Sequence, residues 1–345
     1  MKGLVKVARG MRELELRDVV LRAPGTGEAL IGVRYAGICG TDLHIMADEF
    51  PSWPPVILGH EFVGIVEGVG DGVDPQLMGT RVVSEPHAFA CHTCYLCRRG
   101  FAEVCASKRS PGWGIDGAFA SHLVLPTWLL HRVPDGLPDL AAVLAEPMAV
   151  ALTALRRAHL AAGDHVLVIG PGPVGLLAAL AARASGAADI VVAGRRAGGR
   201  LETASQIGLG VTTTDEAADR VRMETEGRGA DVVIETTGSA AGVKAGFDAS
   251  RRHGRMVAIG LSGREEIAVP WDLAVSRALD VAFSMSSNYE AWDPALAILN
   301  KVAKDAIALP TVMPLTDWRA AFDAVAERTV LKAVLDPNVG GASPT

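Results

Sequence analysis

The sequence predicts an α/β protein of two domains, a β-rich first domain and a second domain built on a doubly wound parallel sheet. Its 345 residues are more than a single core usually holds. Residues 1 to about 148 are rich in glycine, proline and valine, with short strands between turns. Further on, buried strands alternate with alanine-rich helical stretches, as in a sheet of βα units. We expect the first domain to comprise 1–149 and 286–345, and the second 150–285.

Short runs of β-forming residues mark the strands of both domains. In the first domain they are 29–35, 64–69 and 80–84. In the second they are 165–169, 189–193, 230–235 and 255–260, and a helix is expected over 176–184. Two helices near 294–304 and 317–327 and a strand over 330–335 are expected to complete the first domain.

The composition narrows the classes of partner. The net charge of −6 argues against nucleic acid and against an anionic membrane surface. The apolar runs near 141–152 and 174–184 are interrupted by Glu146, Pro147 and Arg183, so neither predicts a membrane span. The first residues form a strand-like run rather than a signal peptide. We expect a cytoplasmic protein.

Four of the five cysteines lie close together, as Cys91, Cys94, Cys97 and Cys105. Four thiolates at this spacing can surround one tetrahedral Zn²⁺ and leave no position for a substrate, so the cluster predicts a structural zinc site. A disulfide framework is the alternative. The odd number of cysteines and their spacing favour the metal and a reducing compartment.

A glycine-rich turn follows the strand at 165–169 and opens the next helix. Its glycines would allow a tight turn, the approach of a pyrophosphate to the backbone, and close helix–strand packing. The helix N-terminus adds a favourable field for the anion. With the alternating strands that follow, this pattern predicts a dinucleotide site; the alternative is a glycine turn without a ligand. The turn comprises Gly170, Gly172, Pro173, Val174 and Gly175.

The end of the next strand bears on the choice of cofactor. NAD-binding proteins usually carry an Asp or Glu there, and none is present between 190 and 201. Gly194 leaves room for a 2′-phosphate, and Arg195 and Arg196, with Arg200 nearby, would pair with it. The sequence therefore favours NADP(H) over NAD(H). The alternative is that these arginines are ordinary surface charges.

A second group of metal-binding residue types lies apart from the cysteine cluster. Cys39 and His60 are good zinc ligands, and Glu146 offers a carboxylate oxygen. Three protein ligands with one open position describe a catalytic zinc. Glu61 follows His60, but position 64 is glycine where a metalloprotease motif would have its second histidine.

These two zinc sets, the glycine turn and their order resemble the zinc-containing medium-chain alcohol dehydrogenases over essentially the whole chain. The Glu146-Pro147 dipeptide is most similar to the sorbitol, butanediol and threonine dehydrogenase branch. The resemblance implies a GroES-like catalytic domain, a Rossmann cofactor domain, and an oxidoreductase acting on a small-molecule alcohol or carbonyl substrate. It also implies a homodimer or homotetramer.

The resemblance implies that Cys39, His60 and Glu146 hold the catalytic zinc. Glu61 would sit beside the metal as an alternating ligand or a base. Asp42 would hydrogen-bond the free nitrogen of His60 and fix its tautomer.

The resemblance further implies a proton path. Thr41 would take the proton of the alcohol and pass it through ribose hydroxyls toward His44. Zinc as a Lewis acid would lower the pKa of the alcohol, and the nicotinamide would accept the hydride.

The chain departs from sorbitol dehydrogenases at one substrate contact. Ser284 and Met285 stand where those enzymes carry an Arg-Tyr pair that touches the distal hydroxyls, which argues against a linear sugar alcohol. Trp53 and Trp113 are either walls of the substrate site or packing residues. Lys332 is either a contact of a cofactor phosphate or a solvated lysine.

The leading hypothesis is therefore an NADP-preferring zinc dehydrogenase of a secondary alcohol: a diol, polyol, cyclitol or sugar derivative. A zinc hydrolase would have no use for a dinucleotide motif. A non-catalytic cofactor-binding regulator would not need the Cys39, His60 and Glu146 set. A zinc-free quinone or enoyl reductase would lack both metal sets.

Overall fold

The computed structural model describes residues 1–195 and 199–339, and its contacts divide the chain into two compact units. Unit 1 comprises Met1–Glu146 and Asn288–Thr345, and unit 2 comprises Pro147–Ser287. The domain boundaries that we expected from the sequence lie directly after residues 149 and 285. The chain thus leaves unit 1 once, forms unit 2 from one continuous segment, and returns.

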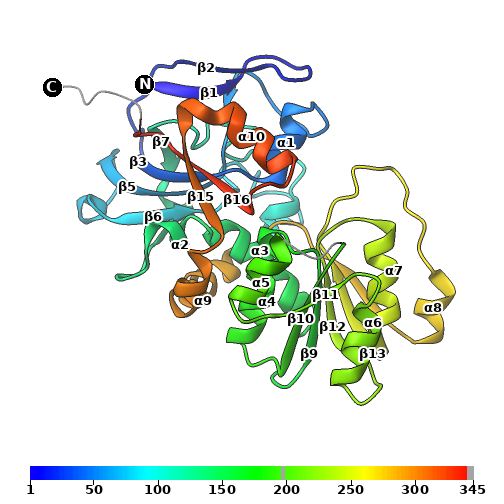
Figure 1. Ribbon diagram of the computed structural model, residues 1–345. Helices are drawn as coiled ribbons and strands as arrows, with labels where there is room; N and C mark the ends of the chain where they lie inside the picture. The colour runs from blue at the N-terminus through cyan, green and yellow to red at the C-terminus, as the bar shows by residue number, and fades with distance from the viewer. Residues whose placement is uncertain (196–198, 340–345) are drawn as a thin grey trace. The chain divides into compact units, whose positions relative to one another are not determined.

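Two sheets form unit 1, and most of their strand pairs are antiparallel (Figure 1). The three-stranded sheet runs in the order β2-β1-β4 and consists of β1 (Lys2–Lys6), β2 (Leu14–Asp18) and β4 (Val56–Ile57). The larger sheet runs in the order β15-β16-β3-β5-β6-β8, with β7 paired to β3. Its strands are β3 (Glu28–Gly37), β5 (Glu61–Val69), β6 (Arg81–Ser84), β7 (His122–Pro126), β8 (Leu130–Arg132), β15 (Pro310–Pro314) and β16 (Lys332–Asp336).

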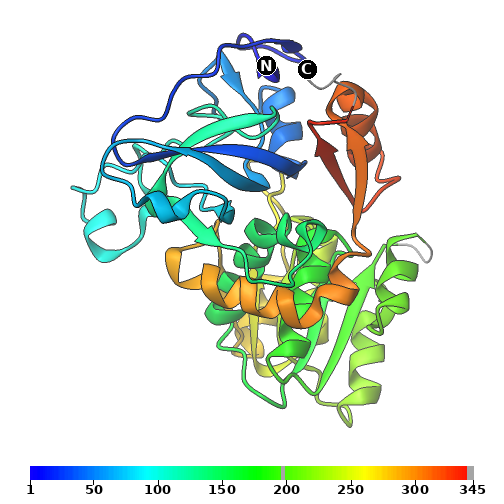
Figure 2. The ribbon, with the colours of Figure 1, turned by 90° about the vertical axis from the view of Figure 1, so that its left-hand side faces the viewer.

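Five helices accompany these sheets: α1 (Gly40–Met46), α2 (Asp139–Ala142), α9 (Trp292–Ala306), α10 (Trp318–Ala326) and α3 (Ala145–Arg157), the last crossing from unit 1 into unit 2. The expected C-terminal helices and strand are present as α9, α10 and β16. In Figure 2 the returning segment β15, α10 and β16 lies beside the N-terminal strands. Unit 1 is therefore incomplete without the end of the chain.

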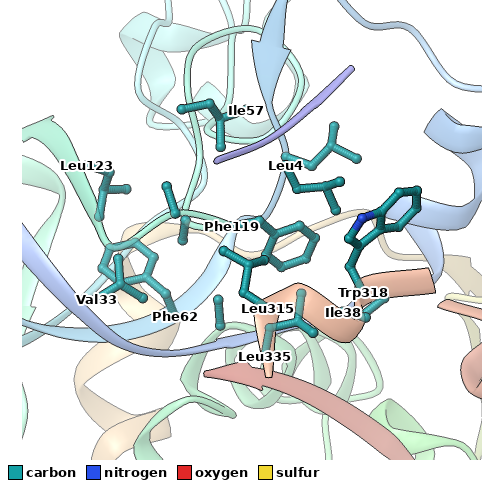
Figure 3. Packing of buried hydrophobic residues seen from close by; sticks show 14 of the residues in the cluster. Leu4, Val33, Ile38, Ile57, Phe62, Phe119, Leu123, Leu315, Trp318 and Leu335 are labelled. Carbon is teal, nitrogen blue, oxygen red and sulfur yellow. The ribbon is translucent and has the colours of Figure 1, made fainter. Parts of the chain in front are cut away.

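One apolar core joins the early and late segments of unit 1. Leu4 from β1, Val33 from β3 and Phe62 from β5 pack with Trp318 from α10 and Leu335 from β16 (Figure 3). Burying side chains of this size stabilises a fold by about 1.5–3 kcal/mol each. This core fixes the ends of β3 and β5, where the metal-binding residue types lie.

Unit 2 is a six-stranded parallel sheet in the order β11-β10-β9-β12-β13-β14, the doubly wound order of dinucleotide-binding domains. Helices α4 and α5 lie on one side of it, and α6 and α7 on the other (Figure 1). The strands are β9 (His165–Ile169), β10 (Asp189–Gly194), β11 (Gly210–Thr213), β12 (Ala230–Glu235), β13 (Ser250–Ala258) and β14 (Asp280–Phe283). The helices are α4 (Pro173–Ala184), α5 (Arg200–Gln206), α6 (Ala217–Glu224), α7 (Ala240–Ala249) and α8 (Trp271–Ser276).

None of the helices within 1–195 and 199–339 has the length and apolar character that crossing a membrane requires.

Candidate active site

The residues of the proposed catalytic metal site come together at the junction of β3, α1 and β5. Gly37 at the end of β3 pairs with Glu61 at the start of β5 in the antiparallel register. Cys39 caps α1 two residues beyond β3, and His60 immediately precedes β5. Two segments that are distant in sequence therefore deliver their side chains to one end of the sheet.

Cys39, His60 and Glu61 form a group whose ligand atoms all lie within 4.8 Å of one another. His60 and Glu61 are buried. Glu146 is also buried and interacts electrostatically with both, but it does not belong to this close group. Glu61, and not Glu146, is therefore the carboxylate within 4.8 Å of both Cys39 and His60.

The site combines buried carboxylates with buried or half-buried cations. Burial alone would lower the pKa of His60, but Asp42, Cys39 and Glu146 raise it to about 10. Burial raises the pKa of Glu146 to about 7, and nearby cations oppose that rise. His60 Nδ1 is buried and has no hydrogen-bond partner. A thiol, an imidazole with an unsatisfied nitrogen and two carboxylates form a donor set that fits a divalent cation such as Zn²⁺.

Glu61 has a cationic partner that sequence reasoning placed elsewhere. The Lys332 ammonium, on β16, forms an ion pair with Glu61 Oε2 and donates a hydrogen bond to Ile38 O at 2.9 Å. Its side chain is only 3% exposed, so the alternative that Lys332 is a solvated lysine is wrong. Burial would lower the pKa of Lys332, but Glu61 and Cys39 raise it. A Cβ on Gly37 would lie 2.6 Å from Glu61 Oε2, so this pairing requires glycine there.

Asp42 faces the metal-binding histidine without bonding to it. Asp42 Oδ2 accepts a hydrogen bond from Cys39 N at 2.8 Å, which fixes the first turn of α1. Its Oδ1 lies 3.8 Å from His60 Nδ1, longer than a hydrogen bond. The Asp42–His60 hydrogen bond implied by the resemblance is therefore not formed in this conformation.

Thr41 and His44 lie on α1, one turn apart. The Cys39 thiol donates to Thr41 Oγ1 at 3.6 Å, so the Thr41 hydroxyl lies beside the proposed ligands. His44 Nδ1 lies 2.8 Å from Glu49 Oε2, and Glu49 N donates to His44 O at 2.8 Å. A carboxylate accepts a hydrogen bond from a protonated Nδ1, and in the neutral tautomer that carries this proton Nε2 is the acceptor. Sequence reasoning missed Glu49, because nothing in the spacing showed that the turn after α1 brings it back onto His44.

The two tryptophans proposed as walls of the substrate site have different surroundings. Trp113 is buried and packs edge-on against His60, with ring centroids 5.1 Å apart. Trp53 is 42% exposed, lies under the Arg109 guanidinium at 3.7 Å, and lines a separate cavity of about 410 Å³ in unit 1. Trp113 alone therefore contacts the metal-binding group.

Sequence reasoning also missed Lys108, whose ammonium lies 5.7 Å from the centre of the Trp113 ring. Burial lowers the pKa of Lys108 to about 8, and the charges of Glu146 and Glu103 oppose that change. A lysine three residues after the last cysteine of the cluster gave no sign in the sequence of lying near Glu146.

The four clustered cysteines have the geometry of a closed zinc site. All four sulfurs lie within 4.8 Å of one another, with Cys91–Cys97 and Cys91–Cys105 distances of 3.9 and 3.6 Å. A tetrahedral ion with Zn–S bonds of about 2.3 Å requires sulfurs about 3.8 Å apart. Hydrogen bonds from Thr93 and from the Cys94 backbone lower the pKa of Cys91 to about 5, which favours the thiolate. In Figure 2 this loop, in cyan, projects from one side of unit 1.

Fully loaded protein is expected to hold two zinc ions per chain and to lose them in order. The mixed Cys/His/Glu site, with its open position, should yield its metal to a chelator before the four-thiolate loop does. Cys97→Ser should unfold the loop of residues 91–105 more than it disturbs the chemistry, because structural ligation is local folding energy. Metal analysis during chelation measures both, with Ser107→Ala as the control that keeps all four thiols. Reconstituted protein with one metal or fewer and an unliganded Cys91 would contradict the assignment.

The glycine turn in unit 2 has the shape that a dinucleotide requires. Gly170 has φ +108°, and a Cβ on Gly175 would lie 2.0 Å from Gly170 O, so both positions need glycine. A Cβ on Gly172 would meet no other atom within 4 Å, so a pyrophosphate has room to approach the backbone there. Pro173 and Val174 open α4 directly after it. Thr236 donates from its hydroxyl to Ile169 O at 2.9 Å and so ties the end of β12 to this turn.

The end of β10 carries no acidic side chain. Gly194 ends the strand, Arg195 follows it and is exposed, and Arg200 begins α5. Arg196 lies outside the described residues. The positive charges of Arg195 and Arg200, the two described arginines, suit a 2′-phosphate.

Comparison with known proteins agrees with this geometry. Residues 25–135 match the family model of the alcohol dehydrogenase GroES-like domain, and residues 173–301 match that of the zinc-binding dehydrogenases. The sorbitol dehydrogenase of Halalkalibacterium halodurans is 33% identical over 341 residues, which cover 98% of this chain and 99% of that protein. The chain belongs to the zinc-containing medium-chain alcohol dehydrogenase family.

Relatives of this medium-chain dehydrogenase are named as sorbitol, arabitol-phosphate and threonine dehydrogenases and as xylulose reductases. The D-arabitol-phosphate dehydrogenase of Enterococcus avium is 31% identical over 347 residues, with 98% of each chain covered. A zinc-binding dehydrogenase of Sinorhizobium meliloti 1021, solved with NADP bound, shares 29% identity at a TM-score of 0.87, covering 97% of this chain and 99% of that one. The predicted GroES-like and Rossmann domains are thereby confirmed, and the chain is a zinc-dependent alcohol or polyol dehydrogenase.

Proposed function

We propose that this dehydrogenase transfers hydride between a secondary alcohol and NADP(H), the alcohol being a diol, polyol, cyclitol or sugar derivative. The observation that carries the proposal is the close group of Cys39, His60 and Glu61, in which His60 and Glu61 are buried, with the buried Glu146 beside it. Its donor types suit a zinc ion that keeps one position open for the substrate oxygen.

Cys39, His60 and Glu146 would hold the catalytic zinc, and Glu61 would serve as an alternating ligand or a base. Bound zinc supplies Lewis acidity, which lowers the pKa of a substrate hydroxyl. Lys332 would hold Glu61 aside through their ion pair, leaving Glu146 as the carboxylate ligand. Asp42 would fix the His60 tautomer after a small rotation that closes the present 3.8 Å gap.

Proton transfer would be the task of α1. Thr41 would accept the proton of the alcohol, and ribose hydroxyls of the cofactor would pass it to Nε2 of His44. Glu49 supports this direction, because its carboxylate lies 2.8 Å from Nδ1 and favours the neutral tautomer in which Nδ1 donates and Nε2 accepts. Trp113 would hold the His60 ring in position by its edge contact.

Steady-state kinetics of the zinc-replete enzyme test the proposed activity. The panel pairs secondary alcohols, namely 2,3-butanediol, pentitols, hexitols and inositols, with NADP⁺ and with NAD⁺. The expected result is oxidation of at least one class with NADP⁺ preferred. Absence of any alcohol oxidation or carbonyl reduction by fully zinc-loaded enzyme would refute the proposal.

The cofactor preference rests on the end of β10. An Asp or Glu there would bind a ribose 2′-hydroxyl and repel a 2′-phosphate. This chain has Gly194 and an exposed Arg195 instead, with Arg196 and Arg200 following in the sequence. The NADP-bound relative is consistent with this choice.

The Gly194→Asp, Arg195→Ala double variant is expected to shift the preference toward NAD. Each charge-assisted contact to the phosphate contributes roughly 1.5–3 kcal/mol, so one could support a preference of about tenfold to a hundredfold and two a greater one. The measurement is the ratio of kcat/KM for NADP⁺ and NAD⁺. Arg183→Ala, on the far end of α4, serves as the control for loss of a cation. A wild type that favours NAD⁺, or an unmoved ratio, would show that the arginines are only surface charges.

A homodimer or homotetramer is the proposed assembly. Strand β14 ends the sheet of unit 2, and Val281 and Phe283 on it are exposed, as are Trp271 and Val275 of α8. An exposed apolar edge strand invites pairing with a second copy. Sedimentation of the protein only as a monomer at micromolar concentration would contradict this assembly.

The proposed location is the cytoplasm, a reducing compartment, because the four cysteines of the Cys91 cluster must stay as thiolates to bind zinc. Recovery of the protein in another cell fraction would contradict this location.

A further inference from the structure

A second cation lies near the proposed zinc ligands, and no step of the proposed mechanism uses it. Lys108 is half-buried. Its Nζ lies 5.7 Å from the centre of the Trp113 ring, and the same ring packs 5.1 Å from the ring of His60. The Lys108 ammonium therefore lies no farther from the centre of the His60 ring than the sum of these two distances. A phosphorylated sugar alcohol is long enough to span that separation.

Lys108 has few partners for a half-buried ammonium. Its Nζ has three donors, and among residues 1–195 and 199–339 its one hydrogen bond goes to Glu103 O at a long 3.3 Å. Lys332, a fully buried lysine near the same ligands, is by contrast ion-paired with Glu61 and bonded to Ile38 O. An ammonium that is partly removed from water and lacks a close counter-ion gains a strong interaction from an anion that reaches it.

The charges of the loaded metal site leave Lys108 available. A Zn²⁺ held by the Cys39 thiolate and the Glu146 carboxylate has its two positive charges balanced. Glu61 is balanced by Lys332. Once zinc is bound, the negative field that Glu146 exerts on Lys108 is therefore compensated by the ion.

We propose that Lys108 anchors an anionic group, a phosphate or a carboxylate, that the substrate carries away from its reacting carbon. The inference rests on the proposed function, which places the reacting hydroxyl beside His60. A compact ammonium favours a phosphate or carboxylate over an uncharged hydroxyl, because the charge-assisted hydrogen bond is the stronger one. Trp113 forms the apolar wall between the two ends of such a substrate.

Matched pairs of substrates test this assignment in the zinc-replete enzyme. Each pair consists of a neutral alcohol and its charged counterpart: a pentitol and its terminal phosphate, a hexitol and its terminal phosphate, and 1,3-butanediol and 3-hydroxybutyrate. Wild type is expected to favour the charged member. Lys108→Gln should lower kcat/KM for that member by roughly 10- to 100-fold, mainly through KM, and change the neutral member less than about threefold. Lys108→Arg, which keeps the charge, should restore most of the loss.

Controls separate this role from a structural one. Arg109→Gln removes the neighbouring cation, which packs on Trp53, and should leave the ratio within each pair unchanged. An equal loss for charged and neutral members, or release of zinc from the cysteine loop in Lys108→Gln, would overturn the proposal. Calorimetric binding of inorganic phosphate to the zinc-loaded enzyme needs no turnover: weaker binding in Lys108→Gln supports the anchor, and equal binding in both proteins refutes it. Failure to oxidise any alcohol, with phosphate binding still dependent on Lys108, would refute the proposed reaction and not the anion site.

Discussion

Replacing Thr41 with alanine is expected to lower kcat by about 10²–10⁴-fold while zinc content and cofactor affinity stay unchanged. The reason is that the variant removes the first proton acceptor beside Cys39 and leaves every proposed metal ligand in place. The measurements are steady-state turnover at neutral pH, metal analysis and cofactor titration. The loss should fall on kcat, because the interaction is made during proton transfer and not in substrate binding.

Two variants bracket the effect of Thr41→Ala. Thr41→Ser keeps a hydroxyl at the same place and should retain most of the activity. His44→Ala should cost less than Thr41→Ala, because water can partly replace a remote relay. Full activity of Thr41→Ala at neutral pH would refute the proton path and leave the metal assignment standing.

Replacing Lys332 with methionine is expected to destabilise zinc-free unit 1 by about 3–5 kcal/mol. The variant leaves the Glu61 carboxylate buried without its counter-ion and leaves Ile38 O without its donor. Urea unfolding followed by tryptophan fluorescence measures the change, because Trp53, Trp113, Trp128, Trp292 and Trp318 all lie in unit 1.

The metal and an exposed ion pair supply the controls for Lys332→Met. Zinc-loaded protein should lose less stability, because the released Glu61 carboxylate can turn to the metal. Lys2→Met breaks the ion pair between Lys2 and Asp18, whose side chains are 59% and 81% exposed, and it should leave the free energy of unfolding almost unchanged. A Lys332→Met variant as stable as Lys2→Met would contradict the buried pair.

Features encoded in short stretches of sequence were predictable, and features formed by tertiary proximity were not. The glycine turn from Gly170 to Gly175 carries its own spacing, and the GroES-like and Rossmann domains were predicted correctly from patterns of this kind. The Glu61–Lys332 pair joins the start of β5 to the last strand, and no local pattern links two such positions. Lys108 and Glu49 were missed for the same reason, since only the folded loops place them near Trp113 and His44.

The tryptophans illustrate why burial is hard to predict for loop residues. Trp53 and Trp113 both lie in glycine- and proline-rich loops, and the Trp53 backbone N–H even donates to Trp113 O at 2.8 Å. Yet one indole packs on His60 and the other lies exposed beneath Arg109. Loop direction decides between these outcomes, and it depends on contacts that a single sequence does not reveal.

The late position of β16 in the chain sets an order on biosynthesis. A ribosome releases Glu61 long before Lys332, so the growing chain carries this carboxylate for most of its synthesis without the counter-ion that permits its burial. Unit 2 is one continuous segment and is fully released while β15 and β16 are still to come. Domains generally fold as units as they emerge. All of unit 2 is therefore synthesised before unit 1 is complete, and the Glu61 carboxylate at the start of β5 meets its counter-ion only when β16 is made.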